Sequence, residues 1–314
     1  MDKSTILVVG KVLIDEFNEK GRLRRSVGGG GPQAAFGSSV VLPEGKPLLI
    51  SLAGSDLGSS TELVDILRRT GANLSGVKIL DLITPHFRIT INDDVPEHEE
   101  GPGFENWLTM LQTDYEIPSG HESIDTMHVL IERGGFNDLR LARAWRKNAS
   151  PGSFLSFEPV ILRESPQEDY NSFRAIVSEC DTVSPDCNCF YLSVVKDSDP
   201  REVINEWSTY GPSSVTVRCG REGSYLWDRK EGKSWHIPIF EVSTIDVTGA
   251  GNAYAAAYAT ARYVLGHAPL YSASLASAAG AAAVLSEGLP PVDDALKKFV
   301  YDAAEDIISR VVQL

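Results

Sequence analysis

Cysteine is scarce in this sequence, with only Cys180, Cys187, Cys189 and Cys219 among 314 residues. Four cysteines are too few for the disulfide framework of a secreted scaffold of this length, so we expect a reducing compartment. Cys187 and Cys189 form a C-x-C with no second pair of metal ligands nearby, which favours two ordinary thiols over a zinc site.

Basic residues are also few: the sequence has 29 Lys and Arg and 43 Asp and Glu, which gives a formal net charge of −14. This balance repels a nucleic-acid backbone, although backbone N–H groups can still bind a small anion such as a nucleotide. The apolar run near the N-terminus is too short to span a membrane, and no small-residue cleavage site follows it. We therefore expect a cytoplasmic protein that binds neither nucleic acids nor membranes.

Short apolar, β-branched runs alternate with helical patterns along most of the chain. Buried strands are predicted at 5–10, 46–54, 126–132, 152–159, 180–185 and 213–220, and a hairpin at 223–238. Helices are predicted at 32–42, 59–73, 137–149, 170–179, 199–211, 274–288 and 292–314. The alternation predicts an α/β protein with a mostly parallel central sheet and helices on both faces.

Two segments do not fit that buried sheet and predict a smaller second one. They are a hairpin that leads into the glycine run at 28–31 and an alternating strand at 86–93. We expect a single domain over 1–314, with lid strands within about 12–27 and 84–95. The acidic segment 93–100 is predicted to be a solvated loop, or else a lid-adjacent insertion that could cover substrate. "FENWLTML" further along is predicted to form a helical turn or two.

A glycine turn stands out in "IDVTGAGNAYAAAY" (245–258), between a strand-like run and a small-residue helix. In an open parallel sheet, ligands bind outside the carboxyl ends of the strands, where this turn is expected to lie. Gly249 and Gly251 would let the N–H groups of Ala250, Gly251 and Asn252 converge at the positive end of a helix, which suits a transferred phosphoryl group. The spacing is equally compatible with a well-capped, tightly packed helix.

Two further features are candidates for a substrate site. Gly30 and Gly31, within four consecutive glycines, permit close approach of backbone to a ligand, or form a flexible hinge. Asp15 follows a buried strand. Its carboxylate could accept two hydrogen bonds from substrate hydroxyls, or it could be a solvated acid at a strand end.

Taken in order, these segments resemble the ribokinase-like (PfkB) carbohydrate kinases. "IDVTGAGNAYAAAY" is similar to the family signature Asp-Thr-x-Gly-Ala-Gly-Asp-x-Phe, "VVGKVLIDEF" to its opening strand and "SVGGGGPQAAFG" to its Gly-Gly substrate loop. "LISLAGSDLGSSTELVDILRRTGANLSGV" matches the Gly-x-Asp-x-x-Gly segment, and "TVRCGREGSYLW" lies where the family has a turn near the nucleotide phosphates. The resemblance implies a ribokinase-like fold, with a β lid over a sugar or nucleoside.

The same resemblance implies roles for individual residues. Asp15, Gly30, Gly31 and Asp246 would bind substrate, Gly249, Ala250 and Gly251 would form an anion hole, and Gly220, Gly223 and Ser277 would contact ATP. Mg²⁺ would accompany ATP, with its protein ligands unknown. Lids of this family often pair across a homodimer, but the basic edge formed by Arg22, Arg24 and Arg25 is equally compatible with a monomer.

Four sites depart from the family pattern. Asn252 replaces the Asp that takes the proton from the attacking hydroxyl, a transfer typically worth about 10²–10⁴ in rate. The family's Asn-x-x-Glu, which helps to organise magnesium, falls on "SPDCNCF", so Asp186 and Cys189 stand at its two ends. An Asn of the substrate loop is replaced near Ala35, and Arg218 stands where Thr is usual.

"FEPV" at 157–160 stands where many sugar kinases have Asp-Pro-Asn. Together with "DVTGAGN", it is similar to a divergent fungal branch typified by the maintenance-of-killer proteins, in which Asn is usual at the base position. The sequence predicts a divergent ATP-dependent phosphotransferase acting on a hydroxyl of a sugar, nucleoside or other small polyol. A non-catalytic pseudokinase that binds a nucleotide or metabolite stays open, as does an altered chemistry at the same anion hole.

Overall fold

The computed structural model describes residues 4–19, 22–92, 95–132, 135–160, 171, 174–187 and 199–314. In this part of the chain, a ten-stranded sheet has the order β14-β13-β12-β11-β10-β9-β8-β1-β4-β5. The strands from β11 to β5 pair in parallel, and those from β11 to β14 pair antiparallel. The mostly parallel sheet expected from the alternating pattern is confirmed.

Most strands of the main sheet lie close to their predicted positions, whereas β5 and β14 were not predicted. They are β1 Ser4–Val9, β4 Lys46–Gly54, β5 Asn73–Leu80, β8 Thr126–Glu132, β9 Phe154–Val160, β10 Thr182–Val183, β11 Ser214–Arg218, β12 Ser224–Asp228, β13 Lys233–Ile237 and β14 Val312–Gln313. Two differences concern strand extent: β10 is shorter than the predicted 180–185, and the chain ends in β14 rather than in the predicted helix.

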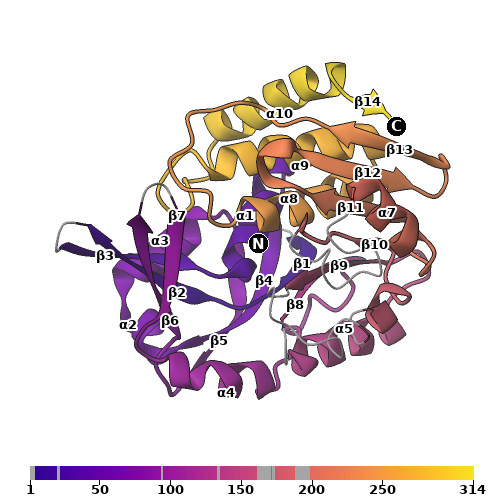
Figure 1. The fold of residues 1–314 in the computed structure, drawn as a ribbon. Helices are drawn as coiled ribbons and strands as arrows, with labels where there is room; N and C mark the ends of the chain where they lie inside the picture. Colours follow the sequence, from indigo (N-terminus) through magenta and orange to yellow (C-terminus); the bar gives the residue numbers. More distant parts are fainter. Residues whose placement is uncertain are drawn as a thin grey trace.

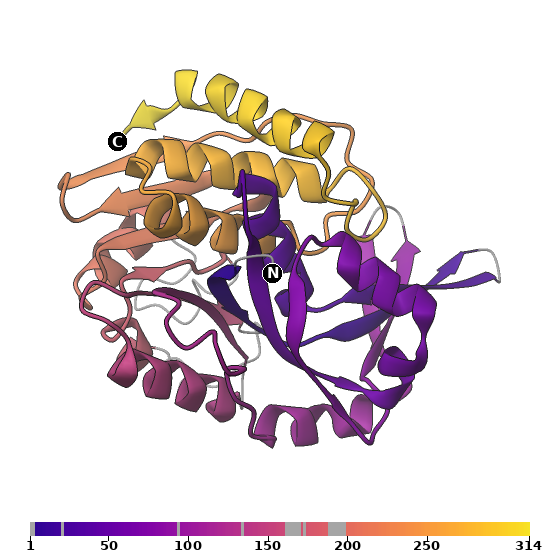
Figure 2. The same ribbon diagram turned by 180° about the vertical axis from the view of Figure 1, so that it is seen from behind.

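The helices cover both faces of this sheet (Figures 1 and 2). They are α1 Gly30–Val41, α2 Ser55–Ser59, α3 Thr61–Arg69, α4 Trp107–Gln112, α5 Phe136–Asn148, α7 Pro200–Ser208, α8 Ala250–Ala259, α9 Pro269–Ala283 and α10 Asp294–Ser309. The helix predicted at 170–179 lies partly outside the described residues. None of the helices in the described part of the chain is long and apolar enough to cross a membrane.

Strand β1 shows why a continuous apolar run belongs in the middle of such a sheet. Successive side chains of a strand point to opposite faces. Leu7 and Val9 therefore join one buried cluster, with side chains of α4, α5 and α7, while Ile6 and Val8 join another, with side chains of α1, α3 and α8. A strand covered on both faces needs no polar alternation.

Helices α1 and α8 approach one another closely at a glycine. A Cβ built on Gly37 of α1 would lie 2.0 Å from the carbonyl oxygen of Ala253 in α8. No side chain larger than hydrogen fits there, so the two backbones meet directly. This contact brings the glycine run at the start of α1 and the glycine turn at the start of α8 to the same part of the molecule.

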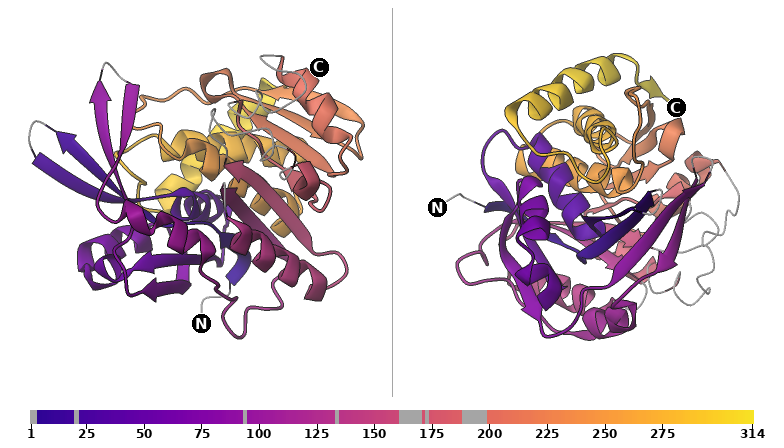
Figure 3. Two further views of the ribbon diagram at one scale, coloured as in Figure 1. Left: turned by 60° about the horizontal axis from the view of Figure 1, so that its bottom comes forward. Right: turned by 90° about the vertical axis from the view of Figure 1, so that its left-hand side faces the viewer.

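A separate four-stranded sheet, in the order β3-β2-β6-β7, projects from the rest of the molecule (Figure 3). It consists of β2 Leu13–Glu19, β3 Arg22–Gly28, β6 His86–Asn92 and β7 Val95–Glu100. The prediction of a loop at 93–100 is wrong, because 95–100 pair antiparallel with β6. An acidic sequence is compatible with an edge strand, where charge prevents pairing with other chains.

A disulfide joins Cys187 to Cys219, so the prediction of two ordinary thiols at the C-x-C is wrong for Cys187. Cys189 lies outside the described residues. Cys180 is a buried thiol outside this disulfide, and burial raises its pKa. The sequence does not suggest the pairing, because 32 positions separate the two cysteines and only the fold places the end of β11 beside the segment after β10.

We expect reduction of this disulfide to destabilise the protein by about 2–4 kcal/mol, because a cross-link restricts the unfolded chain. Thermal unfolding with and without a reductant measures the effect. A Cys187→Ser/Cys219→Ser variant is the control, and its melting temperature should not respond to reductant. Alkylation of all four cysteines in the non-reduced, unfolded protein, followed by mass spectrometry, would contradict the pairing.

Candidate active site

The glycine turn before α8 has the geometry of an open helix N-terminus. Gly249 has φ 83°, in the left-handed region, and no side chain caps α8. The first N–H groups of a helix have no acceptor within the helix. The Ala250 N–H lies 3.4 Å from the carbonyl oxygen of Val247, so the following amides, of Gly251 and Asn252, are the better placed to bind an anion.

Asn252 is held by a second amide side chain. Its Nδ2 donates to Oε1 of Gln33, in α1, at 2.6 Å. A Cβ built on Gly30 would lie 3.3 Å from the same nitrogen, and one built on Gly249 would lie 2.2 Å from Cδ of Gln33. The structure therefore brings the glycine run, the glycine turn and Asn252 together. Sequence reasoning missed Gln33.

Asp15, on β2, is almost buried, with 8% of its surface exposed. A Cβ built on Gly28 would lie 1.9 Å from its carboxylate, so a glycine is needed at that point of β3. Burial, and then the nearby charge of Asp246, raise the pKa of Asp15 to about 7. Asp246 accepts hydrogen bonds from the backbone N–H groups of Thr248 and Gly288, at 2.9 and 3.2 Å. The two predicted substrate acids therefore lie close enough for their charges to interact.

A pocket of about 690 Å³ opens beside the glycine turn. Its walls include Asp186, Arg218, Gly220, Gly223, Phe240, Val247, Ala250, Gly251, Tyr254, Ser277, Gly280 and Val284. All three residues predicted to contact ATP line it, together with Ala250 and Gly251 of the predicted anion hole. The loop Gly220–Glu222, a 3-10 helix, contributes to one part of its wall, and residues of α9 contribute to another.

The loop and α9 are fixed by local contacts. Gly223 has φ 88°, and a Cβ there would lie 2.3 Å from the carbonyl oxygen of Ile237. The Ser277 hydroxyl donates to the carbonyl oxygen of Pro238 at 2.9 Å. Of the two altered Asn-x-x-Glu positions, Asp186 lines the pocket, while Cys189 lies outside the described residues. Ala35 is fully buried in α1.

A buried charge cluster behind the glycine run was missed by sequence reasoning. Lys11 is 1% exposed, and its Nζ donates to Asp138 at 2.5 Å and to Tyr115 at 3.2 Å. The Lys11 carbonyl oxygen accepts from the N–H of Gly31 at 3.1 Å. Burial raises the pKa of Glu132, at the end of β8, to about 8, although the Lys11 charge opposes this. A lysine directly after an apolar strand was the available signal.

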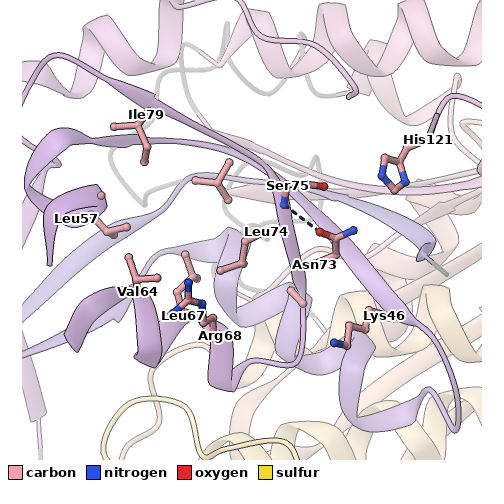
Figure 4. A pocket seen from close by; sticks show the side chains of 13 residues that line it. Lys46, Leu57, Val64, Leu67, Arg68, Asn73, Leu74, Ser75, Ile79 and His121 are labelled. Carbon is pink, nitrogen blue, oxygen red and sulfur yellow. Dashed lines mark hydrogen bonds between the residues drawn. The ribbon is translucent and has the colours of Figure 1, made fainter. Parts of the chain in front are cut away.

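A second pocket, of about 640 Å³, lies between α3 and β5 and contains none of the predicted site residues. Figure 4 shows apolar side chains such as Leu57 and Leu74 around it, with Lys46 and His121 towards one side. The Ser75 N–H donates to Oδ1 of Asn73 at 3.0 Å within it. It gathers no acidic pair or glycine turn, so the pocket beside α8 is the candidate for chemistry.

The sequence profile of the pfkB family carbohydrate kinases matches residues 137–293, half of the chain, including the turn and the loop described above. The chain belongs to this family. It is also similar to the 5-dehydro-2-deoxygluconokinases of Clostridium perfringens (31% identical over 117 residues, 36% of this chain and 34% of that protein) and Clostridium beijerinckii (31% over 121 residues, 37% and 35%). Each match covers about a third of the relative's length.

Solved structures match over nearly the whole chain. An E. coli protein assigned as a ribokinase II, in complex with ATP and Mg²⁺, has a TM-score of 0.74 at 17% identity, covering 98% of this chain and 100% of that one. Arabidopsis thaliana ribokinase, complexed with ribose and ATP, has 0.72 at 18%, covering 96% and 99%. The nucleoside kinase of Methanocaldococcus jannaschii has 0.71 at 17%, covering 99% and 100%. The fold of this PfkB-family chain is ribokinase-like.

Proposed function

We propose that this PfkB-family protein is an ATP-dependent phosphotransferase that acts on a hydroxyl of a sugar, nucleoside or other small polyol. One observation carries the proposal: the glycine turn opens on one side into the pocket beside α8 and, through Asn252, meets the glycine run on the other. A phosphate at this turn would therefore lie between a nucleotide site and a substrate site. The sheet β3-β2-β6-β7 serves as the lid.

Each part of the site has a chemical role in this proposal. Asp15 accepts hydrogen bonds from substrate hydroxyls and orients them. The N–H groups of Gly251 and Asn252, at the positive end of α8, stabilise charge on the transferred phosphoryl group. Asn252, fixed by Gln33, leaves its carbonyl oxygen as the acceptor that holds the attacking hydroxyl. The transition state of phosphoryl transfer is loose, so the attacking hydroxyl loses its proton late and passes it to water, and positioning alone supports a reduced rate.

The residues present also suit Mg²⁺ bound to ATP. In the described part of the chain, no three His, Cys, Asp or Glu side chains gather into a metal site. Magnesium in nucleotide sites is usually held by one or two carboxylates together with phosphates and water, and Asp186 in the pocket is such a carboxylate. When bound, Mg²⁺ would neutralise charge on the phosphates.

The hydrogen bond between Asn252 and Gln33 favours one alternative function. A pair of neutral amides at the base position suits a protein that binds a nucleotide or metabolite without turnover, a pseudokinase. The two functions share the pocket and the turn, and they differ in whether ATP is consumed. Nucleotide binding is common to both, so it is the first property to measure.

We expect Mg-ATP to stabilise the wild-type protein in thermal unfolding, by about 2.7 kcal/mol at 100 times the dissociation constant. Gly249→Ala should abolish this stabilisation, because its Cβ is strained at positive φ and collides with Gln33. Gly266→Ala is the matched control: Gly266 has φ 70° with nothing within 4 Å of a Cβ, so it carries similar strain away from the pocket.

Thermal unfolding and an ATP-consumption assay together distinguish these functions. Stabilisation by Mg-ATP that survives Gly266→Ala but not Gly249→Ala supports a nucleotide site at the turn. ATP consumption with a panel of sugars, nucleosides and polyols then separates the phosphotransferase from the pseudokinase. A wild-type protein that is stabilised by neither Mg-ATP nor Mg-ADP would contradict both functions.

A further inference from the structure

Arg218 places a fixed positive charge against the glycine turn. It ends β11, only 6% of its surface is exposed, and it lines the pocket beside α8. A Cβ built on Gly251 would lie 2.5 Å from its Nη1, so the guanidinium packs directly on the backbone of the turn. Its charge also acts on Tyr254, one turn further along α8, where it opposes the rise in pKa that burial causes.

The guanidinium is held in place from the opposite side. Nη1 donates to Oε1 of Glu158 at 2.5 Å, and Nη2 donates to the carbonyl oxygen of Ser184 at 3.0 Å. The other carboxylate oxygen of Glu158 lies 3.3 Å from Nε2 of His128, and Nδ1 of His128 lies 2.9 Å from the Ser156 hydroxyl. Glu158 and His128 are at most 1% exposed. A rigid, buried chain of contacts therefore fixes the direction of Arg218.

A buried ion pair is expensive to desolvate and gives little net stability compared with apolar packing. Arg218 nevertheless lines the pocket beside α8 and is not enclosed in the apolar core. A guanidinium is always charged and matches the geometry of phosphate oxygens. Because its Nη1 packs against Gly251, the guanidinium lies where negative charge would develop on a phosphoryl group held at the turn.

We propose that Arg218 contacts the terminal phosphoryl group of a bound nucleoside triphosphate and acts as a catalytic cation beside the backbone anion hole. Glu158 and His128 are its positioning residues. The inference rests on the proposed function, since it requires that the pocket beside α8 binds a nucleotide. It implies that the site discriminates a triphosphate from a diphosphate by a protein charge in addition to any metal.

The test compares binding of a non-hydrolysable ATP analogue and of ADP by isothermal titration calorimetry, with Mg²⁺ and with EDTA. Removing Arg218 alone would leave Glu158 charged and buried, so the informative variant is Arg218→Met/Glu158→Gln. Glu158→Gln alone, which keeps Arg218 and an acceptor for it, is the matched control. Arg218→Lys retains the charge without the planar fork. Melting curves without ligand verify that each variant folds.

The double variant should bind the ATP analogue roughly 10- to 100-fold more weakly than Glu158→Gln, the loss expected for a charged hydrogen bond, with ADP affinity nearly unchanged. The difference should be larger in EDTA, when no metal shares the phosphate charge. Equal losses for ATP analogue and ADP, or no loss for either, would overturn the role of Arg218 while leaving the nucleotide site intact. A wild-type protein that binds neither ligand would overturn the proposed function itself.

Discussion

Replacing Asn252 with Asp is expected to raise ATP turnover by roughly 10²- to 10⁴-fold, the usual contribution of a positioned general base. The substitution changes one atom of the side chain, so packing is preserved. The Gln33 amide, which now accepts from Asn252 at 2.6 Å, can turn and donate to the new carboxylate. A negative charge in the first turn of α8 is also favourable to the helix.

Asn252→Ala is the control for this variant, because it breaks the contact with Gln33 without adding an acid. It should turn ATP over no faster than the wild type. Consumption of ATP is measured with the same panel of hydroxyl compounds for all three proteins. If Asn252→Asp binds ATP but gains no turnover, the site has been altered for a purpose other than phosphoryl transfer, and the phosphotransferase proposal is wrong.

Asp15→Asn is expected to stabilise the protein at alkaline pH and to abolish its response to the hydroxyl substrate. In the unfolded chain the Asp15 pKa is near 3.8, and in the folded protein it is about 7. The folded state therefore holds the proton more tightly, and stability falls as pH rises from about 4 to 7. Above pH 7, ionisation of Asp15 lowers the free energy of unfolding by roughly 4 kcal/mol. A neutral Asn at this position has no such effect.

Urea unfolding at pH 5 and pH 8 measures this effect. The gain from Asp15→Asn should be larger at pH 8 than at pH 5 by roughly 2–3 kcal/mol. Asp81→Asn, at an exposed position, should show no such difference. A gain that is independent of pH would contradict a proton held at Asp15, and a variant that still binds the hydroxyl substrate as the wild type does would contradict its proposed role.

The sequence was informative where one local pattern determines both conformation and chemistry. The glycines at 249 and 251 mark a tight turn at the start of a helix, and Gly249 does adopt positive φ, whereas the sequence left open whether the helix is capped. Strands β1 and β4 could be predicted because a continuous apolar run of this length is typical of a strand that is buried on both faces of a sheet. The residues predicted to contact ATP, Gly220, Gly223 and Ser277, line one pocket, and their prediction depended on the resemblance to the PfkB kinases.

The sequence was uninformative where partners come from distant segments. Arg218 was noticed as a departure, but its contacts with Glu158 and Gly251 depend on the order of β9, β11 and α8. Gln33 was overlooked because nothing local marks it as the partner of Asn252. The strand at 95–100 was taken for a loop because its acidic residues mask a pairing that only β6 provides.

A crystal structure with Mg²⁺ and a non-hydrolysable ATP analogue would show directly whether the glycine turn binds phosphate. We expect the terminal phosphate within hydrogen-bond distance of the Gly251 and Asn252 N–H groups, with the base in the pocket between the Gly220–Glu222 loop and α9. A nucleotide whose phosphates bind away from this turn, at saturating concentration, would contradict it.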